Sequence, residues 1–285
     1  MEPGPTITIA NGADLPSRGF GTAPMEEAVA ERSVRHAIEA GYRLIDTAEN
    51  YGNEAAVGRG IRASGLDREA LFVVSKCNRE WHSRRGVQQA YVNSVRRLGL
   101  DRLDMLMLHW PNPELGGFVD AWRGLLRLFE QGDVRALGTS NFTPAHLERL
   151  VQETGVAPHV NQIQLNPWMP RVAERRFHAA LGVITQSWGP LGQGWGMPDP
   201  GDGPRLLEES PVRAASEALG RTPAQVVLRW HLQLGVAPVA KSATPARIEE
   251  NLEVLDFRLT GEQMAAISDL DRGGVGIVDP DEFGH

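Results

Sequence analysis

The sequence predicts an α/β fold in which eight parallel strands, each followed by a helix, close into a barrel. Strand and helix patterns alternate along the chain, the strands are nearly continuous apolar runs, and most connections are short. No Gly-x-Gly-x-x-Gly motif follows an early strand, which disfavours an open nucleotide-binding sheet. Because the composition shows no break along the 285 residues, we expect a single domain over residues 1–285.

The elements follow one another in a regular order. A hairpin is predicted first, from Thr6–Ile9 through a turn at Asn11-Gly12 to a second run ending at Leu15. Barrel strands are predicted at Arg18–Gly21, Leu44–Asp46, Leu71–Lys76, Met105–His109, Val134–Thr139, Val160–Gln164, Val183–Ser187 and Val236–Ala240. Apolar residues at helical spacing predict helices at Glu26–Ala40, Glu54–Ala63, Arg85–Leu98, Val119–Gln131, Ala145–Glu153, Arg171–Leu181, Pro211–Leu219, Ala224–Leu234 and Pro245–Val254. Two long irregular segments, Gly189–Ser210 and the tail Asp271–His285, are of a length that usually indicates function or mobility.

Composition excludes several classes of function. The net charge of −7, with no Lys/Arg cluster longer than a pair, argues against nucleic acid as a partner. One cysteine, Cys77, permits neither an internal disulfide nor a thiolate metal cage, and the histidines lack a ligand spacing, so no metal is expected. The chain begins without a basic or long apolar segment, and no stretch reaches about 18 apolar residues. We therefore expect a cytoplasmic protein that does not bind membranes and, without a long exposed apolar stripe, a monomer.

Four ionisable side chains lie where neighbouring predicted strands end. Asp46 ends one strand within the segment GYRLIDTAENYGNE, Tyr51 follows in the next loop, and Lys76 and His109 end the next two strands. In a parallel barrel these ends share one face, so the four should meet there. A lysine held by an aspartate would lower the pKa of the tyrosine from about 10, and a histidine could hydrogen-bond a carbonyl oxygen. This set donates a proton to a developing alkoxide, and a nicotinamide could supply the hydride.

Other interpretations of the same residues remain open. Taken singly, Asp46 could cap a helix, Tyr51 could be a half-buried aromatic, Lys76 a solvated charge and His109 a packed histidine. A lyase using Lys76 as a Schiff-base nucleophile is a further alternative, which Asp46 disfavours because it would keep the amine protonated.

Several motifs in order and spacing resemble the aldo-keto reductase family over essentially the whole chain. They are Gly41–Glu54, Lys76, His109-Trp110-Pro111, Leu137–Phe142, Asn161–Gln164, Ser187–Gly194, Lys241-Ser242 and Arg247–Asn251. The segments Gln186–Gly194 and Thr222–Gln233 are most similar to the bacterial 2,5-diketo-D-gluconate reductases. The resemblance implies a (β/α)8 TIM barrel plugged by the N-terminal hairpin. It implies Tyr51 as general acid, Lys76 as the modifier of its pKa, Asp46 as the partner of Lys76, and His109 as the group that orients the carbonyl.

The same resemblance implies NADPH/NADP+ as the cofactor and a small-molecule ketone or aldehyde as the substrate. The implied cofactor residues are Thr22; Ser140, Asn141 and Gln162 at the carboxamide; Trp188 under the nicotinamide; Gly189, Pro190, Leu191 and Gln193 at the pyrophosphate; Lys241, Ser242 and Arg247 at the 2′-phosphate; and Glu250 and Asn251 near the adenine. Two cations and a hydroxyl suit a phosphate dianion, so NADPH should be preferred over NADH. A non-catalytic NADP(H)-binding sensor or partner subunit is the alternative, and a missing tetrad residue would favour it; none is missing.

The chain departs from the family pattern beside the lysine. Many relatives carry Leu-Trp-Asn after it, whereas this chain has Cys77-Asn78-Arg79, with Trp81 further on. Asn166 and Ala240 also replace a usual histidine and proline. These changes leave the expected mechanism intact and the substrate open.

Overall fold

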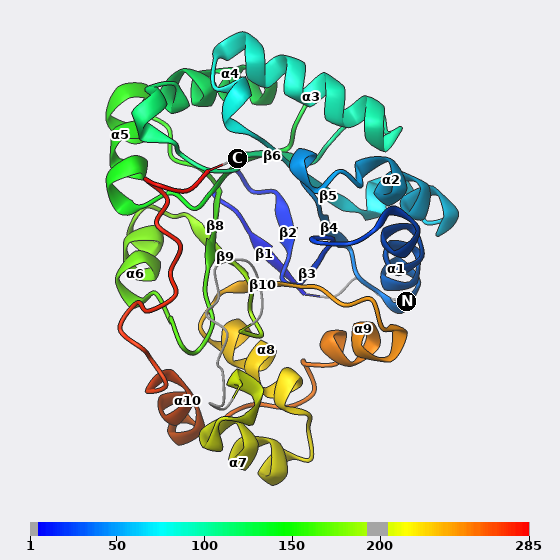
Figure 1. The fold of residues 1–285 in the computed structure, drawn as a ribbon, viewed down its shortest axis with the longest axis vertical. Coiled ribbons are helices and arrows are strands. Elements are labelled where there is room, and N and C mark those ends of the chain that lie inside the picture. The colour runs from blue at the N-terminus through cyan, green and yellow to red at the C-terminus, as the bar shows by residue number, and fades with distance from the viewer. Residues whose placement is uncertain (1–4, 193–204, 285) are drawn as a thin grey trace.

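The computed structural model describes residues 5–192 and 205–284, and these form the predicted closed parallel barrel (Figure 1). The strands neighbour one another in the order β10-β3-β4-β5-β6-β7-β8-β9. They span β3 Gly19–Gly21, β4 Leu44–Asp46, β5 Phe72–Cys77, β6 Met105–Leu108, β7 Ala136–Ser140, β8 Val160–Gln164, β9 Ile184–Trp188 and β10 Ala237–Ala240. Nearly every strand residue is buried, because helices cover the outside and side chains fill the inside.

An N-terminal hairpin closes one end of the barrel. Strands β1 (Thr6–Thr8) and β2 (Asp14–Pro16) pair antiparallel, with Ile7 opposite Leu15, and Gly12 takes the positive φ of 83° that the turn requires. Leu15 is fully buried in a cluster with inward-facing barrel side chains such as Phe72. Figure 1 shows the hairpin within the ring of strands, as the predicted plug requires.

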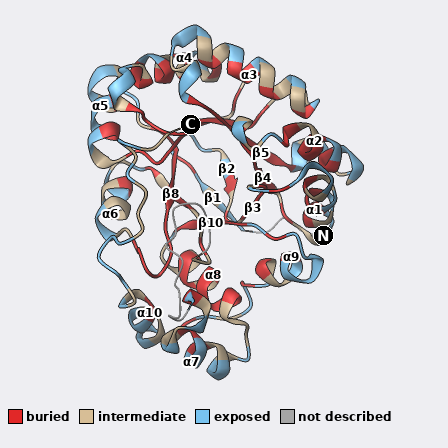
Figure 2. Cartoon of the chain, viewed as in Figure 1, coloured by how far each residue is buried: buried red, intermediate tan, exposed pale blue. Residues whose placement is uncertain are grey.

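Helices surround the barrel and bury one face each, while their outer faces stay exposed (Figure 2). They span α1 Glu27–Ala40, α2 Glu54–Ala63, α3 Arg84–Leu98, α4 Phe118–Glu130, α5 Pro144–Thr154, α6 Val172–Ala180, α7 Ser210–Leu219, α8 Pro223–Gln233, α9 Pro245–Leu252 and α10 Gly261–Ser268. Short 3-10 helices lie at η1 Glu49–Tyr51, η2 Arg68–Ala70, η3 Arg79–Trp81, η4 Pro113–Leu115 and η5 Leu206–Glu208. Within the described ranges, no helix is long and apolar enough to cross a membrane.

Helix α10 was not among the predicted elements. A capping box begins it, because the Thr260 hydroxyl accepts from the Gln263 backbone N–H while the Gln263 side chain accepts from the Thr260 backbone N–H. Ile267 is the helix's fully buried residue, so its apolar stripe is too short to be recognised by periodicity. The Thr-x-x-Gln spacing was the one feature of the sequence that indicated the start of this helix.

Candidate active site

The structure brings the four ionisable residues together at the carboxyl ends of three adjacent strands. Asp46 is the last residue of β4, Lys76 lies one residue before the end of β5, and His109 directly follows β6. Tyr51 ends the 3-10 helix η1, which follows β4. Two predicted strand ends shift by one residue, since β5 continues to Cys77 and β6 stops at Leu108. The shift does not move these side chains off the shared face.

Lys76 is the centre of the group, and its side chain is fully buried. Its Nζ donates to Asp46 Oδ1 at 2.5 Å and to the Thr47 carbonyl oxygen at 3.1 Å, and lies 3.4 Å from the Tyr51 hydroxyl. Burial alone would lower the pKa of Lys76, but the charge of Asp46 and the contacts with Tyr51 outweigh burial and raise the pKa above its usual value. Lys76 is therefore a protonated ammonium beside the phenol oxygen.

Asp46 is held on both oxygens. Its Oδ2 accepts a hydrogen bond of 2.8 Å from Gln162 Nε2, which also donates to Gln186 Oε1 at 2.7 Å. Gln162 and Gln186 are register partners on β8 and β9, so their side chains lie in the same layer inside the barrel. The two donors fix the position of the Asp46 carboxylate, which in turn holds Lys76 in place.

Burial is the largest influence on Tyr51, and it raises the pKa of the phenol above its ordinary value. The positive charge of Lys76 acts in the opposite direction but does not overcome burial, while the charge of Asp46 raises the pKa further. The lowering influence expected from Lys76 is present, but the net shift of this pKa is upward because burial outweighs it. A phenol with a raised pKa keeps its proton throughout the neutral range. The Lys76 ammonium lies close enough to stabilise the phenolate that would remain after the phenol gives up its proton.

His109 faces the Tyr51 ring edge-on, with ring centroids 5.9 Å apart. Its Nδ1 lies 3.4 Å from Asn78 Oδ1, and its carbonyl oxygen accepts from Asn141 Nδ2 at 3.1 Å. Two asparagines from the ends of neighbouring strands thus contact this residue. The imidazole lies close enough to Tyr51 for both to face one small polar group.

A network outside the tetrad fixes the helix that carries Tyr51. The Trp81 indole N–H donates to Glu49 Oε2 at 2.7 Å, and Arg97 Nη2 donates to Glu49 Oε1 at 3.2 Å. Arg97 also donates through Nε to Glu54 at 2.5 Å. Because Glu49 and Tyr51 belong to the same short helix, Trp81 and Arg97 anchor the segment that positions the phenol.

The residues expected at the nicotinamide lie beside the tetrad. Asn141 adopts the left-handed conformation at φ 63°, and its Oδ1 accepts from the Trp188 indole N–H at 2.8 Å. Its Nδ2 also donates to Ser140 Oγ at 3.1 Å. The Gln186 Nε2 is buried without a hydrogen-bond partner within the described part of the chain. An unsatisfied amide donor beside Gln162 and Trp188 fits a polar ligand group at this point.

The two cations that the resemblance assigns to the 2′-phosphate are both exposed. Lys241 directly follows β10, and Arg247 lies in the first turn of α9. Neither makes an ion pair with any residue in 5–192 or 205–284. Ser242 Oγ accepts from the Thr244 backbone N–H at 3.1 Å between them. Free cations at a helix N-terminus fit a phosphate.

Other residues expected at the cofactor are held by the fold. The Thr22 hydroxyl donates to the Asp46 carbonyl oxygen at 3.1 Å, and Glu250 accepts from the Thr222 hydroxyl at 2.6 Å. Asn251 is buried in α9. Gly189, Pro190 and Leu191 begin the loop after β9, and Gln193 lies outside the described residues.

The C-terminal tail passes over the same end of the barrel (Figure 1). Gln164 Nε2 donates to the Gly276 carbonyl oxygen at 3.1 Å, and its Oε1 accepts from the Val278 backbone N–H at 2.9 Å. Farther on, the Phe283 ring meets Trp110 edge-on at 4.8 Å between centroids. The tail therefore contributes an aromatic wall next to His109. No group of three or more potential metal ligands is found among the residues that the structure describes.

Comparison with known proteins gives the family. Residues 11–272 match the aldo/keto reductase family. This chain belongs to the aldo-keto reductases. The 2,5-diketo-D-gluconic acid reductase B of Corynebacterium sp. (strain SHS752001) is 44% identical over 277 residues, which are 97% of each chain. A Gox0644 variant solved in complex with NADPH is 36% identical, with a TM-score of 0.91 over 99% of both chains. The Bombyx mori aldo-keto reductase, solved in complex with NADP, is 31% identical with a TM-score of 0.88 over 99% of this chain and 97% of that chain.

The family and the barrel that the sequence predicted are thereby confirmed, and the aldo-keto reductase is an oxidoreductase. The roles of individual residues stay predictions. Contacts that sequence reasoning missed include the Gln162 bond to Asp46, the contact of Asn78 with His109, and the link from Trp81 to Glu49. The first two contacts had a sequence signal, because polar residues at the ends of parallel barrel strands lie on the same face of the barrel. The third contact had no such signal, because Glu49 and Trp81 belong to the short 3-10 helices η1 and η3 and not to strand ends.

Proposed function

We propose that this aldo-keto reductase reduces a ketone or aldehyde to an alcohol with NADPH, with Tyr51 as the proton donor. The observation that carries the proposal is the buried ammonium of Lys76, held by Asp46 at 2.5 Å and lying 3.4 Å from the Tyr51 hydroxyl. A buried lysine held charged at a phenol oxygen has no evident structural purpose, because replacing such a pair by apolar groups is often neutral or stabilising.

The residues divide the chemistry between them. When bound, the nicotinamide supplies the hydride that goes to the carbonyl carbon. Tyr51 holds its proton at neutral pH and gives it from Oη to the carbonyl oxygen, which becomes the alcohol hydroxyl. Lys76 then stabilises the phenolate, and Asp46 with Gln162 keeps Lys76 oriented. His109 faces the same point and orients the carbonyl oxygen.

The proposed cofactor residues lie along the mouth of the barrel. Asn141 and Gln162 fit the carboxamide, and Trp188 offers an aromatic face for the ring. Lys241 and Arg247 fit a 2′-phosphate because they are exposed and have no carboxylate partner among the described residues. The relatives named above, solved with NADP or NADPH, support the same cofactor here.

Replacing the phenol tests the proton donor. Tyr51→Phe should cut carbonyl reduction by about 10²–10⁴-fold, because a general acid is lost, while NADPH affinity stays nearly unchanged. The assay follows NADPH absorbance with keto-sugar acids, dicarbonyls and aromatic aldehydes. Tyr91→Phe is the matched control, since the Tyr91 hydroxyl bonds the Asp133 carbonyl oxygen away from the barrel mouth.

The outcomes separate three possibilities. Activity lost in Tyr51→Phe and kept in Tyr91→Phe supports the mechanism. Activity retained in Tyr51→Phe would refute the assignment of the donor. NADPH binding without reduction of any carbonyl by the wild type would favour a sensor or partner subunit instead.

The chain has only two lysines, Lys76 and Lys241, which allows a direct test of the phosphate contact. Lys76 is fully buried and Lys241 exposed, so an amine-reactive reagent should label Lys241 and leave Lys76 unlabelled. NADP+ should protect Lys241 from labelling, as measured by mass spectrometry, and NAD+ should protect it much less. Lys241→Ala should weaken NADPH binding by about tenfold or more and change NADH binding little. Equal weakening of the two cofactors would count against the assignment.

A further inference from the structure

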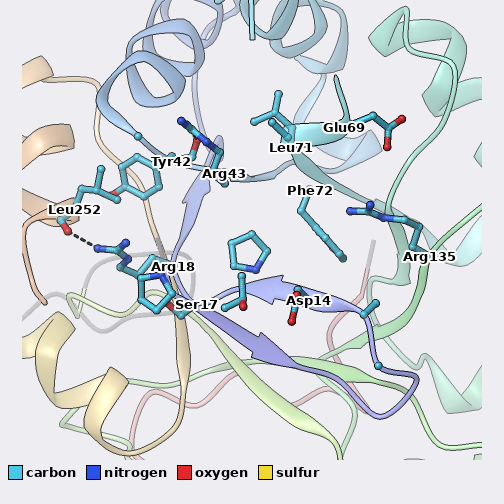
Figure 3. Close-up of a pocket in the computed structure, with 17 residues that line it drawn as sticks. Asp14, Ser17, Arg18, Tyr42, Arg43, Glu69, Leu71, Phe72, Arg135 and Leu252 are labelled. Carbon is cyan, nitrogen blue, oxygen red and sulfur yellow. Dashed lines mark hydrogen bonds between the residues drawn. The ribbon is translucent and has the colours of Figure 1, made fainter. Parts of the chain in front are cut away.

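Figure 3 shows a cavity of about 470 Å³ lined by residues that precede or begin the barrel strands, which places it at the end opposite Tyr51. Its walls come from the hairpin β1–β2 and from residues that precede or begin the strands β3, β4, β5 and β7. This volume is within the range of pockets that bind small molecules. The proposed reaction uses none of its residues.

Arg18 occupies one side of the cavity, together with Tyr42 and Leu252, whereas Glu69 and Arg135 lie on the other side (Figure 3). Arg18 Nη1 donates to the Leu252 carbonyl oxygen at 2.5 Å and so caps the C-terminus of α9. Arg18 has no carboxylate partner among residues 5–192 and 205–284. The cap uses one nitrogen of the guanidinium and leaves Nε and Nη2 as donors.

Burial lowers the pKa of the Arg18 guanidinium, and the Tyr42 hydroxyl nearby opposes that shift. A partly buried cation without a counter-ion is costly, because it has lost water and gained little in return. An anion in the cavity would remove that cost.

Two further polar groups line the same side without hydrogen-bond partners. Ser17 is only 7% exposed, and its Oγ has no partner in the part of the chain that the structure describes. The Tyr42 hydroxyl likewise makes no hydrogen bond within those residues. Buried hydroxyls are rarely left unsatisfied, so Ser17 Oγ indicates a missing ligand atom, and the Tyr42 hydroxyl is a second donor on the same side of the cavity.

The charged groups around the cavity make its electrostatic potential differ from one side to the other. Arg43 also caps a helix, donating to the carbonyl oxygens of Ile38 and Tyr42, and adds positive potential near Arg18. Glu69 is paired with Arg102 at 2.7 Å and lies across the cavity from Arg18 (Figure 3). Arg135 lies on the side of Glu69 but is paired with Asp104 at 2.9 Å, so the charges of that side are compensated. An anionic group is therefore favoured at the Arg18 side, where the guanidinium has no carboxylate partner among the described residues.

We propose that this cavity binds a small molecule that carries one oxyanion, a carboxylate or a phosphate monoester. Arg18, Ser17 and Tyr42 hold the oxyanion, because a guanidinium fork and two hydroxyls match its oxygens. The apolar body lies against Leu71 and the Phe72 ring, which line the middle of the cavity. The site is separate from the proposed cofactor phosphate site at Lys241, which lies beyond the other end of the strands.

Thermal unfolding with inorganic phosphate tests the proposal. Phosphate is titrated against sodium chloride at constant ionic strength, with NADP+ saturating so that the nucleotide site is filled. Phosphate should raise the melting temperature of the wild type. Arg18→Gln should shift the phosphate dependence to concentrations at least about tenfold higher, since a charge-assisted contact is lost. Ser17→Ala should shift it several-fold without affecting the fold, because its hydroxyl makes no bond among the described residues.

Arg35→Gln is the matched control, since Arg35 is an exposed arginine on α1 and its removal changes the net charge equally. A response kept in Arg35→Gln and weakened in Ser17→Ala supports the site even where Arg18→Gln is too unstable to measure. Acetate in a parallel titration distinguishes a carboxylate ligand from a phosphate ligand, and protection by either supports the proposal. The proposal is overturned if neither anion stabilises the wild type, or if all the variants respond alike.

Discussion

Asp46→Asn tests whether the buried ion pair exists for chemistry or for stability. The Lys76 side chain is 1% exposed and that of Asp46 is 4% exposed, so removing the carboxylate charge leaves a buried ammonium without a counter-ion. Breaking such a pair costs about 3–5 kcal/mol of unfolding free energy. The loss should be larger at pH 6 than at pH 9, because without Asp46 burial lowers the pKa of Lys76 and a neutral amine is easier to bury.

The double variant Asp46→Asn/Lys76→Met separates the two roles. Removing both charges leaves no buried ion, so stability should return to within about 1 kcal/mol of the wild type, while carbonyl reduction stays lost. Urea unfolding followed by tryptophan fluorescence measures the first effect and NADPH absorbance the second. The reasoning is refuted if the double variant is as unstable as Asp46→Asn, or if Asp46→Asn costs less than about 1 kcal/mol.

Two further predictions concern acid stability and the segment that carries the phenol. His178 is fully buried, accepts from Asn161 Nδ2 at 3.0 Å, and burial lowers its pKa to about 4. Because the unfolded chain binds the proton more readily, the unfolding free energy should fall by up to about 3 kcal/mol as the pH drops from 6.5 to 4. Urea titrations at several pH values should show a smaller fall in His178→Gln. The same dependence of unfolding free energy on pH in this variant and the wild type would contradict the prediction. Trp81→Phe keeps an aromatic ring, although a smaller one, and removes the N–H donor to Glu49, so kcat should fall several-fold through a less well-placed Tyr51 while NADPH affinity stays unchanged. Steady-state kinetics beside direct NADPH titration would show this, and an unchanged kcat would exclude the positioning role.

Short apolar runs and the repeated strand-then-helix order of the sequence were enough to predict every barrel strand to within a few residues. Strands such as β6 (Met105–Leu108) are buried on both faces, so all their residues are apolar. Helix α10 was not predicted because few of its residues are buried, and its capping box is a signal of only two residues. Local patterns predict an element well when most of its residues are buried.

The tetrad could be predicted because its members end successive strands, and barrel closure places all strand ends on one face. The direction of the Tyr51 pKa could not be, since it depends on how completely the fold removes water from the phenol and on the 3.4 Å to Lys76. The sequence supplied the charges, whereas the geometry decided their balance.

The sequence by itself determined the barrel, the family and which ionisable groups share the mouth, because strand order converts positions along the chain into positions on one face. Only the tertiary structure decided what those groups bind. Gln162 reaches Asp46 from 116 positions away, Trp81 holds Glu49, and Arg18 lies beside Tyr42 in a cavity at the far end. Such contacts depend on side-chain directions and on burial, which exist only once distant segments have packed together.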